Sequence, residues 1–221
     1  MTNKCDRSNR RRREVLIPAT ALDLPQRSNR KAAQSRSPNS FVSAKTAIPI
    51  PSEHPALCEA LIQLSLDPRV RSIDYVKTAI VASEQIDLRA VVVQRVDGRF
   101  FLDVVQARPI RNLEHEGLSL IALAELGLRP LVISAKSLLR EPRYSNALFV
   151  WLYNGHRVPP EQRKRILRVL TDKEPIELGQ LERCVRSDPF YSVMSLACDD
   201  LIELDLISTP LGRRTTVRRR A

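Results

Sequence analysis

The dipeptide Asp97-Gly98 constrains the fold of this chain most, because it separates two runs of residues that favour strands. The first run, Leu88–Val96, has Val91-Val92-Val93 at its centre, and Phe100–Val105 follows the dipeptide. An Asp-Gly pair favours a tight turn whose backbone needs positive φ, which glycine adopts at little cost. The sequence therefore predicts a β-hairpin in the middle of the chain.

Helices and further strands are expected on both sides of this hairpin. Leucines at helical spacing predict a helix over Pro55–Leu66, which Asp67-Pro68 ends. The other expected elements are a strand over Val70–Ala82, a helix over Glu114–Leu126 capped by Gly127, a strand over Leu131–Ile133 and a helix over Ser145–Tyr153. This order predicts an α/β fold in which helices flank a mixed sheet.

The pattern changes after Pro159-Pro160. The expected elements are helices over Glu161–Leu170, around Leu178–Val185 and from the cap Asp188 onward, then strands over Leu204–Ile207 and Thr215–Val217. Three helices followed by a hairpin predict a small winged helix-turn-helix domain. A generic small helical tail is the alternative.

Positive charge is concentrated at the two ends of the chain, whose net charge is +11. Residues 1–48 hold eleven Lys or Arg against three acids, and the tail after Leu211 holds five arginines and no acid, so the middle carries −2. Such arms bind nucleic acid without reading its sequence. An anionic membrane is a rival partner, but the first arm lacks the aromatic and leucine face of an interfacial helix. The candidate DNA contacts are Arg10, Arg11, Arg12, Arg13, Arg213, Arg214, Arg218, Arg219 and Arg220.

Composition divides the chain into three parts. Residues 1–48 are predicted to form a disordered basic arm without which the fold survives, because Ser, Asn, Arg and Pro dominate there. Residues 49–158 and 159–221 are expected to be the sheet domain and the winged-helix-like domain with its basic tail. No segment approaches the roughly 18 apolar residues that a membrane span needs, and the four cysteines form no CxxC pair. We therefore expect a cytoplasmic protein with reduced thiols and no membrane partner.

The expected order of elements is that of restriction-type nucleases. Their chemistry needs acids at the ends of two hairpin strands, and a Glu on the preceding helix, to hold Mg²⁺. A Lys two residues after the second acid orients the attacking water, and this spacing places acid and Lys on one face of the strand. The metal lowers the pKa of that water and stabilises charge on the phosphate.

Several stretches in order resemble the TnsA-type transposon endonucleases. They are Cys58–Val70, Val96–Val104, Leu126–Ile133 and Pro142–Ala147, followed by the winged-helix-like end. The resemblance covers about residues 50–218. It implies a restriction-endonuclease-like core with a C-terminal winged helix, Mg²⁺ or Mn²⁺ if the nuclease site is active, and a transposase or an ATP-dependent transposition regulator as partner.

The resemblance maps the metal-binding helix Glu onto Glu59. The Pro-Asp of the family falls on Arg89-Ala90, which leaves Asp87 as the nearest substitute. The acid-x-Lys falls either on Asp103-Val-Val105, which lacks the Lys, or on Val104-Val-Gln106, which lacks the acid. The candidate site residues are Glu59, Asp87, Asp103 and Gln106, with Glu59 and Asp103 as weak metal ligands. An ordinary surface Asp and a solvated helix Glu are the alternative interpretation.

These observations predict a TnsA-like component of a mobile-element system that binds double-stranded DNA and has a weakened or lost nuclease site. Two alternatives stay open: an active metal-dependent endonuclease that cuts transposon ends, and a winged-helix transcriptional regulator. The stretch Asp188–Glu203 contains four acids and no Lys or Arg, so phosphates would repel it. DNA contact through the arginines after Leu211 fits better.

Overall fold

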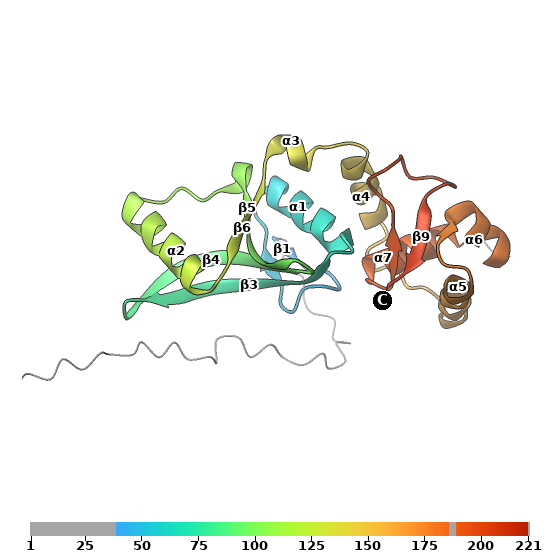
Figure 1. Cartoon of the computed structure of the whole chain (residues 1–221), viewed down its shortest axis with the longest axis horizontal. Helices are drawn as coiled ribbons and strands as arrows, with labels where there is room; N and C mark the ends of the chain where they lie inside the picture. The colour runs from blue at the N-terminus through green and yellow to red at the C-terminus, as the bar shows by residue number, and fades with distance from the viewer. Residues whose placement is uncertain (1–38, 186–188, 221) are drawn as a thin grey trace, which may run out of the picture. The chain divides into compact units, whose positions relative to one another are not determined.

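The computed structural model describes residues 39–185 and 189–220 and has a mixed α/β fold (Figure 1). Its largest sheet has four strands in sequence order, namely β3 (Val70–Val81), β4 (Glu84–Arg95), β5 (Gly98–Val104) and β6 (Arg129–Ile133). The first three strands are antiparallel, and β6 runs parallel to β5. Helices flank this sheet, so the α/β class predicted from the sequence is confirmed.

The turn predicted at Asp97-Gly98 joins β4 to β5. Arg95 pairs with Gly98, and Gly98 has a φ of 135°. A Cβ at this position would lie 2.6 Å from Nη2 of Arg129, which donates to the Asp97 carbonyl at 2.7 Å. Glycine therefore serves both the backbone conformation and the close approach of the arginine.

Strand β4 begins four residues before the Leu88 expected from the sequence. Ala82 and Ser83 both have positive φ, 49° and 75°, and turn the chain directly from β3 into β4. Neither residue is a Gly or Asn, the usual signals for such a turn. The register slips between Val76 and Thr78, beside Arg89, whose φ is 48°.

The alternation of side chains along β4 gives each face of the sheet its own helix. Val91 and Val93 belong to the apolar cluster that includes Leu61 of α1 (Pro55–Leu66). Val92 belongs to a different cluster, with Leu123 of α2 (Leu113–Glu125). The two helices therefore cover opposite faces, and both were predicted within one residue at each end.

Residues 39–51 correct the predicted boundary of the disordered arm. Strand β1 (Ser40–Phe41) pairs with β2 (Ile50–Pro51), and Lys45 is 4% exposed. Phe41 is also 4% exposed and stacks on Trp151 with ring centroids 5.2 Å apart. The long-range contact that orders this segment has no local sequence signal. The rest of the predicted arm lies outside the described residues.

The chain then passes through α3 (Ala135–Leu138), which was not predicted, and α4 (Arg143–Trp151) into a C-terminal module. The module consists of α5 (Pro160–Asp172), β7 (Ile176–Glu177), α6 (Leu178–Val185), α7 (Phe190–Cys198), β8 (Ile202–Leu204) and β9 (Thr216–Arg219). Its three antiparallel strands have the order β7-β9-β8 and share one apolar core with its helices. The predicted cap Asp188 lies outside the described residues.

One strand of this module differs from the expected Leu204–Ile207. Asp200 has a φ of 58° just after α7, so β8 begins already at Ile202. The Asp205 carboxylate then accepts hydrogen bonds from the amides of Ile207 and Ser208, both at 3.1 Å, which turns the chain away from the sheet.

Phe41→Ala is expected to lower the free energy of unfolding by about 3–5 kcal/mol, because it removes a buried ring and leaves a cavity beside Trp151. Urea denaturation of the full chain measures the change. Ile80→Ala, at a side chain that is 63% exposed, is the control and should cost under about 0.5 kcal/mol. An equally small loss for Phe41→Ala would show that residues 39–51 do not belong to the core.

Candidate functional site

The carboxylate of Asp103, the candidate metal ligand on β5, forms an ion pair with Arg108. Its two carboxylate oxygens accept hydrogen bonds from Nε and Nη2 of Arg108 at 2.7 and 2.6 Å. The Asp103 side chain is 17% exposed, and the hydrogen bond to its carboxylate raises the pKa of the Arg108 guanidinium. A bidentate pair of this kind uses the oxygens that a metal would need.

Glu59 and Asp87, the other candidate acids, also have protein partners. Oε1 of Glu59, on α1, accepts a hydrogen bond from the Tyr144 hydroxyl at 3.1 Å. Oδ2 of Asp87 accepts one from Nε of Arg89 at 2.7 Å. Asp87 pairs with Thr78 on the far side of the register slip in β4, and its backbone oxygen lies 3.1 Å from Nε2 of His115.

Gln106 offers no replacement for the missing lysine. It is exposed in a single 3₁₀ turn, Val105–Ala107, that follows β5. Strand β5 ends at Val104. The last residue of either register proposed for the acid-x-Lys motif, Val105 or Gln106, therefore lies outside the strand. The alternation that would align an acid with a lysine is lost there.

The described residues contain no group of three or more His, Cys, Asp or Glu that could hold a metal ion. Mg²⁺ and Mn²⁺ favour several oxygen ligands, with carboxylates among them. Glu59, Asp87 and Asp103 instead bind a tyrosine and two arginines, so these residues do not fit a divalent-cation site.

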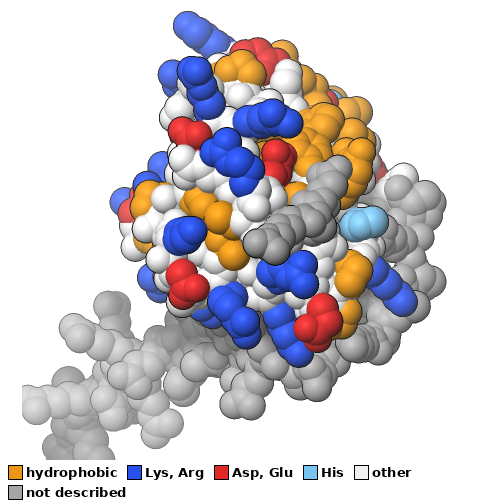
Figure 2. Space-filling model, turned by 90° about the vertical axis from the view of Figure 1, so that its right-hand side faces the viewer, with side chains coloured by type: hydrophobic (Ala, Val, Ile, Leu, Met, Phe, Trp, Pro, Cys, Tyr) orange, Lys and Arg blue, Asp and Glu red, His pale blue; other side chains and the backbone are white. Residues whose placement is uncertain are grey.

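The basic residues near the C-terminus differ in exposure and in contacts within the protein. Arg213, Arg214 and Arg218 are exposed. Figure 2 shows a face of the molecule with Lys and Arg side chains spread among acids and a patch of hydrophobic side chains. Arg219 is exposed but donates a hydrogen bond to Oγ1 of Thr171 at 2.8 Å. Arg10–Arg13 lie outside the described residues.

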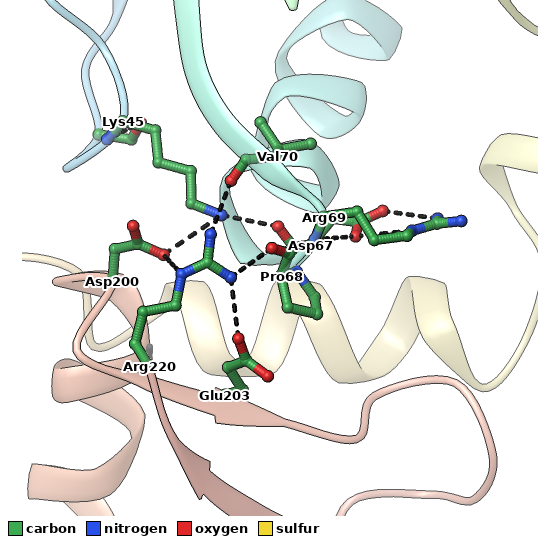
Figure 3. Close-up of polar contacts among 9 residues, drawn as sticks. Lys45, Asp67, Pro68, Arg69, Val70, Asp200, Glu203 and Arg220 are labelled. Carbon is green, nitrogen blue, oxygen red and sulfur yellow. Dashed lines mark hydrogen bonds and ion pairs between the residues drawn. The ribbon is translucent and has the colours of Figure 1, made fainter. Parts of the chain in front are cut away.

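Arg220 differs from the expected DNA contact, because its side chain is only 16% exposed and is fully engaged within the protein. Its guanidinium donates to Oε1 of Glu203 at 2.9 Å and to the backbone oxygens of Pro68 and Val70. Nε of Arg220 also lies 3.4 Å from Oδ1 of Asp200 (Figure 3). Pro68 and Val70 lie in the α1–β3 turn and at the start of β3, Asp200 lies between α7 and β8, and Glu203 lies in β8.

Lys45 reaches the same place from the segment between β1 and β2. Its Nζ donates to the Asp67 backbone oxygen at 2.7 Å and lies 3.3 Å from Oδ1 of Asp200 (Figure 3). We call the set of Lys45, Asp67, Asp200, Glu203 and Arg220 the polar seam. It joins the segment before α1, the α1–β3 turn and the C-terminal module.

Burial and charge act in opposite directions on the titratable groups of the polar seam. Burial lowers the pKa of Lys45 more than the nearby Asp200 raises it. Burial alone would raise the pKa of Asp67, but hydrogen bonds from Arg69 and the charges of Arg69 and Arg143 outweigh it and hold that pKa below its usual value. Asp67 is thus held as a carboxylate.

Sequence reasoning missed the polar seam. Its members are far apart along the chain, and Asp67 had been interpreted only as a helix stop. The pairing of Arg220 with residues 68 and 70 spans about 150 positions, for which no local pattern gives a signal.

Comparisons with known proteins add no family. No protein-family model matches the chain, and no curated protein matches it. Among the described residues, no helix is both long and apolar enough to cross a membrane.

Asp67→Asn is expected to lower the free energy of unfolding by about 1–2 kcal/mol at pH 7, because it removes the buried carboxylate that accepts hydrogen bonds from the half-exposed Arg69. The folded-state pKa of Asp67 is lowered, so its contribution is present above the unfolded pKa and is lost as pH falls through the folded value. Urea denaturation should therefore show a difference between wild type and variant that begins to shrink as pH falls below about 3.9, the ordinary aspartate value. A constant difference down to pH 2 would contradict this assignment.

Plasmid DNA incubated with the purified full chain and Mg²⁺ or Mn²⁺ should remain intact, because Asp103 is held by Arg108 and no lysine follows it on the strand. Agarose-gel nicking assays should give the same background for wild type and Asp103→Ala. Robust wild-type nicking that disappears in Glu59→Ala or Asp103→Ala would overturn this interpretation and make those carboxylates metal ligands.

Proposed function

We propose that the chain is a DNA-binding, TnsA-like component of a mobile-element system that does not cleave DNA by itself. The observation that carries the proposal is the arrangement of its core. One helix, three antiparallel strands, a second helix and a fourth strand parallel to the third follow in order, and the helices cover opposite faces. This is the arrangement expected for a restriction-endonuclease-like core.

The C-terminal module supports the same proposal. Its order of helix, short strand, two helices and a two-stranded hairpin, with the short strand joining the hairpin, is that expected of a winged helix. Helix α7 would then correspond to the helix that enters the major groove in many such domains. Seven of its nine residues are buried, and Oγ of Ser195 donates to the His156 carbonyl at 2.6 Å.

The burial of α7 weighs against the transcriptional regulator that was considered from the sequence. A helix that reads base edges must present side chains to the groove, and α7 presents almost none. The module therefore fits better as a structural or weakly DNA-contacting part. Its exposed basic side chains include Arg213, Arg214 and Arg218, together with Arg163, Lys164, Arg165 and Arg168 on α5.

We propose that the chain does not cleave DNA because its candidate acids are already bound to other side chains. An arginine on Asp103 supplies a positive charge where a nuclease of this kind would hold a cation, but it cannot activate a water as a metal does. The active endonuclease is the weaker alternative for this reason. The basic surface would then bind the phosphate backbone with little sequence preference.

Replacing Arg213, Arg214 and Arg218 together by alanine should weaken binding of double-stranded DNA and flatten its salt dependence. The slope of log K against log salt is negative, and each lost phosphate contact reduces its magnitude by about 0.9, so the loss of three contacts reduces it by up to about 2.7. Fluorescence anisotropy at several salt concentrations measures the slope. The matched control replaces three exposed cations outside the module, Arg71, Lys136 and Arg140. Equal slopes for the wild type and the first triple variant would refute these contacts.

A further inference from the structure

Helix α2 carries apolar side chains on the side that faces away from the sheet. Ala122 and Leu123 are buried against β3 and β4. The outward residues Leu113, Leu120 and Ile121 are 93%, 53% and 49% exposed. With Gly117 and Ala124 they form what we call the outer stripe. At 3.6 residues per turn, its five residues fall within about 100° of one another around the helix axis.

A helix on the surface of a soluble domain normally presents polar residues on its outer side. The outer stripe departs from this pattern over the length of α2, and Ile110, just before the helix, is also fully exposed. Contiguous exposed apolar side chains of this kind mark interaction sites. None of the described residues buries these side chains.

Gly117 lies in the middle of the outer stripe and has no local structural reason to be glycine. A Cβ added there would meet no atom within 4 Å, and the φ of Gly117 is not positive. Glycine inside a helix costs about 1 kcal/mol relative to alanine. Its lack of a side chain allows the backbone of a second element to approach closely between Leu113 and Leu120.

Glutamates border the outer stripe on both sides. Glu114 and Glu125 follow one edge and Glu116 the other, and α2 contains no Lys or Arg. Glu116 has only a long ion pair, 3.7 Å, with Arg111. None of the ion pairs formed within the described part of the chain involves Glu114 or Glu125. The occupant of this surface must therefore bring positive charge beside its apolar residues.

We propose that the outer stripe of α2 binds an amphipathic helix of a partner protein whose apolar face is bordered by Lys or Arg. Helices bind in this way through anchors three and four residues apart, and Leu113, Gly117, Leu120 and Ala124 lie at i, i+4, i+7 and i+11. A second copy of the chain fits less well, because a symmetric contact through α2 would bring the glutamates of both copies together. Nucleic acid and anionic lipid would be repelled by the same carboxylates.

The first test uses a synthetic helical peptide of about 20 residues, long enough to form a helix on binding. It has leucines on one face and lysines along both edges, and a matched peptide has glutamates in place of the lysines. Fluorescence anisotropy with the full chain should show saturable binding of the lysine peptide only. Leu120→Gln should weaken it about tenfold or more. Leu139→Gln, at another leucine that is 52% exposed, should leave it unchanged.

The second test exchanges the charges at the border. The double variant Glu114→Lys with Glu125→Lys should weaken binding of the lysine peptide and permit binding of the glutamate peptide. Far-UV circular dichroism and the urea midpoint check that these exposed substitutions leave the fold intact. Absence of saturable binding, equal binding of both peptides, or no effect of Leu120→Gln would overturn the proposal. Self-association of the wild type that Leu120→Gln abolishes, seen by sedimentation, would assign the surface to a second copy and overturn it as well.

Discussion

Two cations, the buried Lys45 and the largely buried Arg220, share the Asp200 carboxylate, and the arrangement of the described chain depends on this contact. A charge removed from water is tolerated only when partners replace the water. Here the partners come from the β1–β2 segment, the α1–β3 turn and the C-terminal module. Each of these segments supplies a charged side chain or a backbone oxygen to the others. The α/β core and the C-terminal module are therefore joined by polar contacts as well as by apolar packing.

The need of a buried charge for a partner also explains the pairing of Asp103 with Arg108. The side chain of Asp103 is largely buried and needs a counter-charge. In a metal-dependent enzyme a bound metal ion would supply that positive charge, could exchange with solvent and would carry a bound water. Arg108 supplies it permanently from the loop five residues later, with no open coordination position. The fold at this place is thus stabilised by a cation that belongs to the chain itself.

Much of the fold followed from local sequence, because the signals were local. Asp97-Gly98 specified a turn, and Asp67-Pro68 ended a helix that the leucine spacing had predicted. Strand β7 and helix α3 were missed, since two and four residues are too few to show a period. Glu59 and Asp103 lie on the expected helix and strand, whereas Asp87 lies within β4 rather than before it, and the partners of all three acids were not predicted. Tyr144 meets Glu59 across 85 positions, and only the folded chain brings them together.

Asp200 meets two unrelated requirements at one position. Its φ of 58° is a conformation that few residues other than glycine, asparagine and aspartate adopt readily, and its carboxylate lies beside two cations. Glycine would satisfy the backbone and leave the cations without a carboxylate, glutamate would keep the charge and strain the backbone, and asparagine would keep the conformation without the charge. The tolerance of this position to mutation is therefore narrower than its partial exposure suggests, because each of these substitutions gives up either the charge or the backbone conformation.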